Sequence, residues 1–260
     1  MIVFIPGFQD TAAVWSGVVE RLEIPGWRLA PVTLSEVDTD TTVRGRVLQG
    51  YCHQVLAARD HLDAGGPVVV VGHSIGAQVA ELVAIALGNS VAGLMLITPF
   101  PMRGGRLSTA QATDFAAAAS QRTPQSAAEE REPLLVNHSQ DVIDLLVAGS
   151  LATPPQLAEQ QLRAWAAGHP LGDGPSPVSA PVLLVGSEDS FVSRQTICAL
   201  VAPRFVHSKI AHVPGAGHWP HVEQPDTTAA LLSGFVCARQ PARVRPPQPR
   251  TLPLNARQRR

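Results

Sequence analysis

Short apolar runs alternate with longer amphipathic stretches over the first hundred residues of the chain. Runs of β-branched and aromatic residues are typical of buried strands, whereas apolar residues three or four positions apart are typical of helices. This pattern predicts strands at 2–5, 27–34, 68–71 and 91–97, and helices at 12–22, 43–62 and 75–87. Such alternation favours right-handed crossovers, and hence an α/β fold with a mostly parallel sheet and helices on both faces.

The alternation stops after residue 98. Alanine-rich helical patterns without a convincing strand follow at 110–119, 127–136, 142–151 and 157–167. We interpret residues 99–179 as an inserted helical cap that ends in a Gly- and Pro-rich loop at 172–177. Residues 1–98 and 180–238 then form one core, completed by a strand at 182–185, a helix near 194–201, a strand near 205–213 and a helix at 227–236.

The composition separates a globular part from a basic tail. At 260 residues with 45% apolar side chains, the chain is long enough to bury one substantial core. Residues 239–260 hold seven Arg, five Pro and no acidic residue, so we expect a disordered tail there. Without those seven charges the formal net charge of −1 becomes −8 for the remainder, which argues against a nucleic-acid partner.

The chain has no segment that suggests a membrane or a metal. Its apolar runs are far shorter than the roughly 20 residues of a membrane-spanning helix, and residues 1–7 lack the basic leader of a signal peptide. We therefore expect no membrane partner and a cytoplasmic location. Cys52, Cys198 and Cys237 lie far apart without metal-binding spacing, so we expect reduced structural thiols and no metal site.

A G-x-S-x-G motif at residues 72–76 connects the strand at 68–71 to the helix at 75–87. In that context the serine occupies a sharp turn whose neighbours two positions away must be small, as Gly72 and Gly76 are. The turn places the hydroxyl at a helix N-terminus, where N–H groups favour developing negative charge. We predict that Ser74 is a nucleophile; the alternative is a glycine-flanked N-cap serine.

A serine hydroxyl needs a base within hydrogen-bond reach. His218 is the preferred candidate because its glycine-rich loop directly follows the last predicted strand, at the sheet edge that carries Ser74. His221 is the main rival, although Pro220 and the helix that follows are expected to turn it away. The other histidines are weaker candidates: His53 and His61 fall on a predicted helix, His138 and His169 fall in the predicted cap, and His73, His207 and His212 are expected to be structural.

The base needs an acid, and the reaction needs oxyanion donors. Asp189 directly follows the strand at 182–185 and is expected at the same edge, whereas Glu188 is disfavoured by register. The first expected donor is the backbone N–H of Ile75, the residue after the nucleophile. The second is that of Phe8, in the loop after the first strand.

Together these motifs resemble the capped alpha/beta-hydrolase superfamily, over residues 2–237. The segments that carry the resemblance are Ile-Pro-Gly-Phe followed by Trp15, Gly-His-Ser-Ile-Gly, Gly-Ser-Glu-Asp and Gly-His-Trp-Pro. The order of Ser74, Asp189 and His218 is the nucleophile–acid–base order of that fold. The resemblance is closest to esterases, lactonases, cofactor-free haloperoxidases or perhydrolases, and carbon–carbon bond hydrolases. It implies acyl chemistry without a cofactor, on a small molecule held between sheet and cap.

Two features depart from the family pattern. The usual His-Gly of the oxyanion loop is Pro6-Gly7 here, which removes a side-chain donor and a backbone N–H. The loop must therefore be braced in another way. We also expect the sheet to lack the antiparallel hairpin that normally precedes the strand at 2–5.

The expected substrate is a small molecule in a mostly apolar pocket, because the predicted cap is rich in alanine and leucine. Gln9, Arg103 and Trp165 are candidate substrate contacts. Arg103 and Arg106 could clamp a carboxylate or could be solvated surface charges.

We predict a serine hydrolase of a carboxylic ester, thioester or lactone that works through an acyl-enzyme. The alternatives are a carbon–carbon hydrolase, a lyase, perhydrolase or oxygenase with the same triad, or a non-catalytic ligand receptor. The oligomeric state is left open.

Overall fold

A parallel sheet of six strands organises the residues that the computed structural model describes, which are 1–62, 65–105 and 121–238. The strand order is β2-β1-β3-β4-β5-β6, and every neighbouring pair is parallel. The strands are β1 (Ile2–Ile5), β2 (Leu29–Pro31), β3 (Val68–His73), β4 (Val91–Ile97), β5 (Val182–Ser187) and β6 (Ser208–Val213). The predicted α/β fold with a parallel sheet is therefore confirmed.

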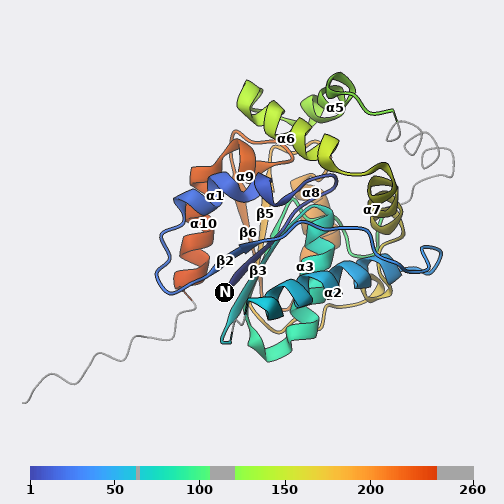
Figure 1. Ribbon diagram of the computed structural model, residues 1–260. Coiled ribbons are helices and arrows are strands. Elements are labelled where there is room, and N and C mark those ends of the chain that lie inside the picture. Colours follow the sequence, from blue (N-terminus) through green and yellow to red (C-terminus); the bar gives the residue numbers. More distant parts are fainter. Residues whose placement is uncertain (63–64, 106–120, 239–260) are drawn as a thin grey trace, which may run out of the picture.

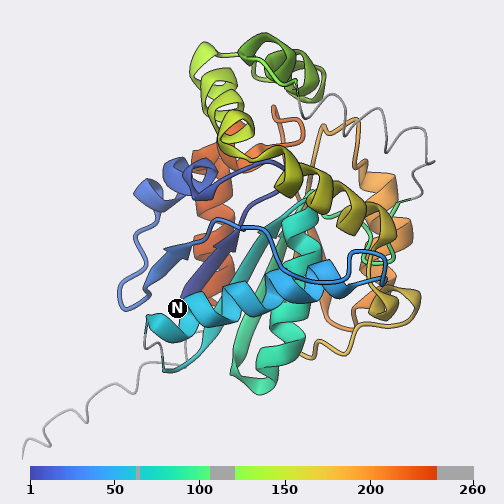
Figure 2. The same ribbon diagram turned by 45° about the vertical axis from the view of Figure 1, so that its right-hand side comes forward.

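Helices cover both faces of this sheet. Helices α2 (Arg46–His61) and α3 (Ile75–Leu87) lie on one side, and α1 (Ser16–Arg21) and α10 (Pro225–Cys237) lie on the other (Figures 1 and 2). Alternate residues of each strand serve the two faces: Val68 and Val70 pack with α2 and α3, whereas Val69 and Val71 pack in the opposite cluster. Because both faces are covered, β3 and β5 are buried at every residue, and each begins with four consecutive apolar residues.

Most predicted elements are present, with differences at their ends. The strands at 2–5 and 91–97 and the helix at 75–87 have the predicted bounds. The predicted strand at 27–34 shortens to β2, because this edge strand pairs only with β1 and its register ends at Pro31. The helix predicted at 12–22 begins as a 3-10 turn before α1, and the one near 194–201 is a short α8 (Arg194–Thr196) that continues as a π-helical turn.

Within the described residues, three helices between β4 and β5 lie beyond the carboxyl ends of the strands (Figures 1 and 2). These overlying helices, as we call them, are α5 (Pro124–Arg131), α6 (Gln140–Ala152) and α7 (Pro155–Ala167). The helix predicted at 127–136 is shifted toward the N-terminus, because a Thr123–Ser126 capping box and Pro124 start it earlier. Part of the loop predicted at 172–177 belongs to a 3-10 turn, Pro170–Asp173.

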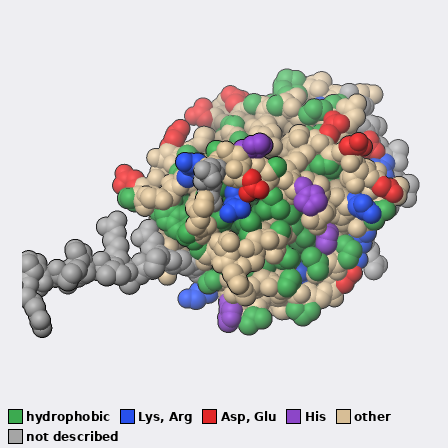
Figure 3. Space-filling model, turned by 60° about the horizontal axis from the view of Figure 1, so that its bottom comes forward, with side chains coloured by type: hydrophobic (Ala, Val, Ile, Leu, Met, Phe, Trp, Pro, Cys, Tyr) green, Lys and Arg blue, Asp and Glu red, His purple; other side chains and the backbone are tan. Residues whose placement is uncertain are grey.

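Three predictions concern residues that the structure does not describe. The helix at 110–119, Arg106 and the tail at 239–260 lie outside the described residues. The division of the chain into a core and a cap stays a prediction. Among the helices that are described, none has the length and apolar character needed to cross a bilayer. The face turned away from the overlying helices carries acidic and basic side chains interspersed with apolar ones (Figure 3).

Candidate active site

Ser74 stands in the tight turn between β3 and α3. Its backbone has φ 52° and ψ −117°, a conformation that a residue with a side chain adopts only when its surroundings impose it. A Cβ on Gly72 would collide with the carbonyl oxygen of Gly76, and a Cβ on Gly76 would collide with that of Pro6. Both positions therefore require glycine, because α3 starts against β3 and against the loop after β1.

The structure brings Ser74, His218 and Asp189 into one hydrogen-bonded chain. The Ser74 hydroxyl donates to Nε2 of His218 at 3.1 Å, and Nδ1–H of His218 donates to Oδ2 of Asp189 at 2.7 Å. Each of the three residues is only 4% exposed. This arrangement can pass a proton from the hydroxyl to the imidazole while the carboxylate stabilises the imidazolium.

Asp189 is held ionised by its surroundings. It follows β5, and its Oδ1 accepts a hydrogen bond of 2.8 Å from the N–H of Phe191. Burial alone would raise the pKa of Asp189, but the contact with His218 and two backbone N–H groups hold it below the usual value. An acceptor that stays ionised fixes the His218 tautomer, leaving Nε2 free to accept a proton.

The loop that carries His218 is fixed by several neighbours. The backbone N–H of His218 donates to the carbonyl oxygen of Leu134 at 2.8 Å. The carbonyl oxygen of His218 accepts from Thr98 Oγ1 at 3.0 Å and from His73 Nε2 at 2.8 Å. Glu223, in the short helix α9 (Pro220–Glu223), accepts from the N–H groups on both sides of His218. These contacts aim the imidazole at Ser74.

The rival residues lie in other environments. Glu188 is exposed, and its side chain accepts a hydrogen bond from the N–H of Gly215. His221 is completely buried, and its ring stacks on Trp15 with the centroids 4.2 Å apart. Burial, followed by the nearby imidazoles His73 and His218, lowers the pKa of His221 well below its usual value. His221 is therefore a neutral packing residue in this structure.

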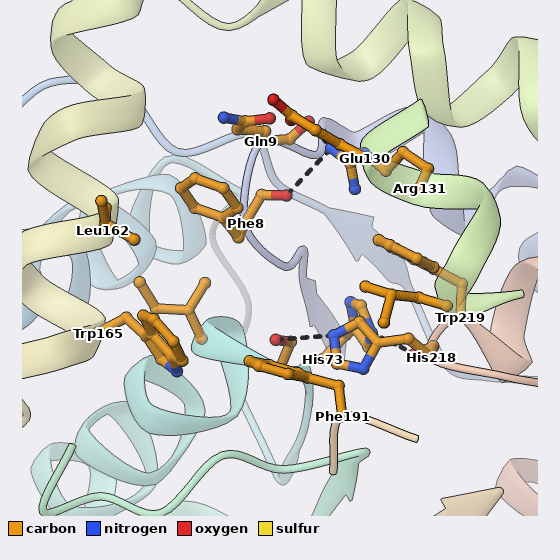
Figure 4. Close-up of a pocket in the computed structure, with 13 residues that line it drawn as sticks. Phe8, Gln9, His73, Glu130, Arg131, Leu162, Trp165, Phe191, His218 and Trp219 are labelled. Carbon is orange, nitrogen blue, oxygen red and sulfur yellow. Dashed lines mark hydrogen bonds between the residues drawn. The ribbon is translucent and has the colours of Figure 1, made fainter. Parts of the chain in front are cut away.

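A mostly apolar cavity of about 400 Å³ opens at Ser74 and His218 (Figure 4). The sheet side contributes Ser74, Ile75, His218 and Trp219, whereas Leu162 and Trp165 come from α7. The other lining residues are Phe8, Gln9, His73, Glu130, Arg131, Leu134 and Phe191. Such a surface suits a small substrate whose non-reacting part is apolar.

Two of the three predicted substrate contacts line this cavity. Gln9 and Trp165 do so, and Gln9 Nε2 has no hydrogen-bond partner among the described residues. Arg103 does not. It lines a neighbouring cavity together with Arg44 and Asp173, which form an ion pair with each other.

The two expected oxyanion donors flank Ser74 in the cavity wall. Ile75 is the first residue of α3, and N–H groups in a first helical turn have no intrahelical acceptor. Phe8 lies opposite, in the loop after β1 (Figure 4). Both residues therefore line the cavity, and their role as oxyanion donors stays a prediction.

The loop after β1 is braced by side chains that the sequence analysis did not identify. Asp10 is 2% exposed, and its carboxylate accepts from Arg131 Nη1 at 3.2 Å and from Trp219 Nε1 at 3.0 Å. Burial alone would raise the pKa of Asp10, but the Arg131 charge, the His73 imidazole and the indole N–H hold it below the usual value. Asp10 looks like a turn residue in the sequence, and no local pattern indicates its distant partners.

The described residues offer no recognisable metal site, because no group of three or more His, Cys, Asp or Glu within them is suitably placed. Among the residues that line the cavity, Ser74 carries a hydroxyl and His218 an imidazole. Cys52 is a buried thiol away from this cavity, and burial raises its pKa to about 11.

Comparisons with known proteins agree with this fold. A model of the alpha/beta hydrolase family matches residues 2–231. A search of curated proteins gave no match. Similar solved structures include an esterase from Thermogutta terrifontis, with 22% identity, a TM-score of 0.73 and coverage of 91% of this chain and 89% of that one.

Two further solved structures are similar over nearly their whole length. An esterase from Exiguobacterium antarcticum has 15% identity, a TM-score of 0.77 and coverage of 91% of each chain. A putative non-heme bromoperoxidase from Mycobacterium tuberculosis has 22% identity, a TM-score of 0.67 and coverage of 92% of each chain. At such identities the likeness concerns the fold, which supports several chemistries.

Proposed function

The chain belongs to the alpha/beta hydrolase family, and from this premise we propose that it is a serine hydrolase of small carboxylic esters, thioesters or lactones. The observation that carries the proposal is the hydrogen-bonded chain from Ser74 through His218 to Asp189 at the mouth of an apolar cavity. Family membership supports hydrolase activity, and the proposal adds the bond that is cleaved and the residues that cleave it.

The reaction would proceed in two halves. Ser74 Oγ attacks the carbonyl carbon while its proton passes to Nε2 of His218, and the oxyanion is held by the N–H groups of Ile75 and Phe8. The tetrahedral intermediate collapses, His218 returns the proton to the leaving alcohol, thiol or ring oxygen, and an ester to Ser74 remains. Water then attacks this acyl-enzyme with His218 as the base, which releases the acid and restores Ser74.

The cavity favours a neutral, apolar acyl group. Its aromatic walls are Phe8, Trp165, Phe191 and Trp219. Arg131, a cation in the lining, is already paired with the buried carboxylate of Asp10, so it offers little net charge to a substrate anion. We therefore expect short to medium apolar acyl groups to be preferred over dicarboxylates.

The test compares substrates and a nucleophile variant. We expect the wild type to hydrolyse p-nitrophenyl esters, a thioester or a lactone, and to be labelled at Ser74 by a fluorophosphonate probe. Ser74→Ala should abolish labelling and lower kcat by about 10⁴-fold or more. Ser16→Ala, which changes an exposed serine of α1, is the matched control and should retain both.

Two results would contradict the proposal. One is full ester hydrolysis by Ser74→Ala. The other is a wild type that cleaves ring-cleavage diketones but none of the esters, thioesters and lactones, which would point to carbon–carbon bond hydrolysis with the same residues.

A further inference from the structure

Gln9 has an unusual backbone conformation next to the proposed oxyanion donor. It directly follows Phe8 and is completely buried, with φ 55°. A residue with a side chain adopts this left-handed conformation at a cost, and it persists where surrounding contacts impose it. The question is therefore which contacts impose it here.

Each of the three overlying helices contributes one hydrogen bond to Gln9. From α7, Gln161 Oε1 accepts from the Gln9 N–H at 2.9 Å. From α5, Arg131 Nη2 donates to the Gln9 carbonyl oxygen at 3.2 Å. From α6, Ser150 Oγ donates to the Gln9 side-chain oxygen at 3.0 Å. The backbone donor, the backbone acceptor and the side chain of one residue are thus held from three separate helices.

Arg131 is itself firmly placed. It is 4% exposed, its Nη1 donates to Asp10, and its guanidinium lies 4.9 Å from the centre of the Trp219 ring. Its Nη2 also lies 3.4 Å from the carbonyl oxygen of Phe8, the contact drawn as a dashed line in Figure 4. Because Trp219 follows His218, one arginine connects α5 to the loop after β1 and to the loop that carries the imidazole.

These contacts bear directly on the donor. The Phe8 carbonyl and the Gln9 N–H belong to the same peptide group, which Arg131 and Gln161 hold at opposite ends. Fixing that plane restricts rotation at Phe8 and therefore the direction of its own N–H. Oxyanion stabilisation depends on a donor that is aimed before the reaction begins.

We propose that the overlying helices position the oxyanion loop through Gln9, with Gln161 and Arg131 as positioning residues rather than substrate contacts. This inference rests on the proposed serine-hydrolase function. The contacts of Gln161 and Arg131 with Gln9 brace the loop after β1, which Pro6 cannot do in place of the family's usual histidine.

The first experiment measures catalysis per active site. The variants are Gln161→Leu and Arg131→Lys; lysine keeps the charge but loses the planar fork that reaches two carbonyls and a carboxylate. The matched controls are Gln156→Leu and Arg163→Lys, which change exposed residues of α7. Active sites are counted with the fluorophosphonate probe, so that partial misfolding does not enter kcat.

We expect kcat for p-nitrophenyl acetate to fall about 10- to 100-fold in both variants, less than the roughly 10²- to 10³-fold cost of losing a donor outright. The KM should change less than threefold, and a boronic acid that forms a tetrahedral adduct with Ser74 should bind more weakly by the factor lost in kcat/KM. A merely structural role would lower the labelled fraction and leave kcat per labelled site unchanged. That outcome, or a change in KM alone, would overturn the inference.

A second experiment does not depend on activity. Amide hydrogen exchange of the peptide covering residues 4–11 should become at least tenfold faster in Gln161→Leu and in Arg131→Lys, but not in the two controls. If the wild type hydrolysed none of the test substrates, the proposed function would fail while this measurement still reported whether the helices hold the loop. Unchanged exchange in both variants would refute the inference.

Discussion

The carboxyl edge of the sheet and the overlying helices form two walls of one cavity, and they are built in different ways. At the sheet edge, Ser74, Asp189 and His218 each stand in a turn after a strand, so the backbone places them. The overlying helices act through side chains such as Arg131 and Gln161, whose partners lie 121 to 152 residues away in the chain. The comparison suggests that the sheet edge sets the chemistry while the helices adjust its geometry and its substrate.

After Ser74→Ala, replacing the acid is expected to have the largest effect, on the sheet side. Asp189→Asn should lower kcat by about 10⁴-fold, roughly 5.5 kcal/mol, because an amide no longer enforces the required His218 tautomer. Steady-state kinetics with a p-nitrophenyl ester measure this effect. Glu188→Gln, its exposed neighbour, is the control and should stay within a few-fold of the wild type. If Asp189→Asn kept a tenth of the wild-type kcat, Asp189 would not be the acid that orients His218.

A pair of helix glycines tests packing on the two walls. Gly76→Ala on the sheet side should destabilise the fold by about 1–3 kcal/mol, because the new Cβ would collide with the backbone of Ile5 and Pro6. Gly149→Ala in α6 should be neutral or stabilising by up to about 1 kcal/mol, because its Cβ would lie 3.4 Å from the Gln9 carbonyl oxygen, an ordinary contact. Urea unfolding measures the change in the free energy of unfolding for both variants. Equal changes would contradict the expected difference in packing between the two walls.

Substrate selection is expected to respond to the overlying helices. Leu162→Ala removes an apolar wall of the cavity, so discrimination between short and longer acyl esters should shift by about 1–3 kcal/mol toward the longer ones. The measurement is kcat/KM over a series of p-nitrophenyl esters. Leu151→Ala, at an exposed leucine of α6, is the control. An unchanged chain-length profile in Leu162→Ala would mean that α7 does not contact the acyl group.

A further expected effect concerns pH and returns to the sheet side. Burial holds the pKa of His73 and of His221 below the usual 6.5, so the unfolded chain binds protons that the folded chain excludes. The contribution of these two histidines to stability should therefore be constant above about pH 6.5 and fall below it, by at most about 1.4 kcal/mol per pH unit for each histidine. The carboxyls of Asp10 and Asp189, with lowered pKa values, lose their stabilising contribution only below about pH 4.

The free energy of unfolding, measured at pH 7.5 and at pH 5, gives the slope of stability against pH. His221→Phe should reduce the slope, because the variant lacks one of the two titrating imidazoles and His73 remains. The replacement costs no hydrogen bond, since neither imidazole nitrogen of His221 has a partner among the described residues. The control His53→Phe changes an exposed histidine of α2 and should leave the slope unchanged. A wild-type stability that is independent of pH between 7.5 and 5 would contradict the expectation.

Predictions from the sequence were most accurate where a residue's place depends on its immediate neighbours. The turn around Ser74 follows from glycines at both sides of a strand–helix junction, and Asp189 and His218 follow from their positions after strands. The shortened β2 and the earlier start of α5 were missed, because strand pairing and a capping box decided those ends. Gln9 was expected to contact substrate; the structure shows it held by three helices as well as lining the cavity.

The α/β architecture and the order of its elements can be predicted from the amino-acid sequence, because the alternation of apolar and polar residues and the glycine turns act over a few positions. Which buried charges pair, as Asp10 does with Arg131, and which helix side chains reach the loop after β1 depend on the packing of distant segments. The physical reason is range: local backbone preferences are written in neighbouring residues, whereas a buried polar group finds its partner only after distant segments have packed around it.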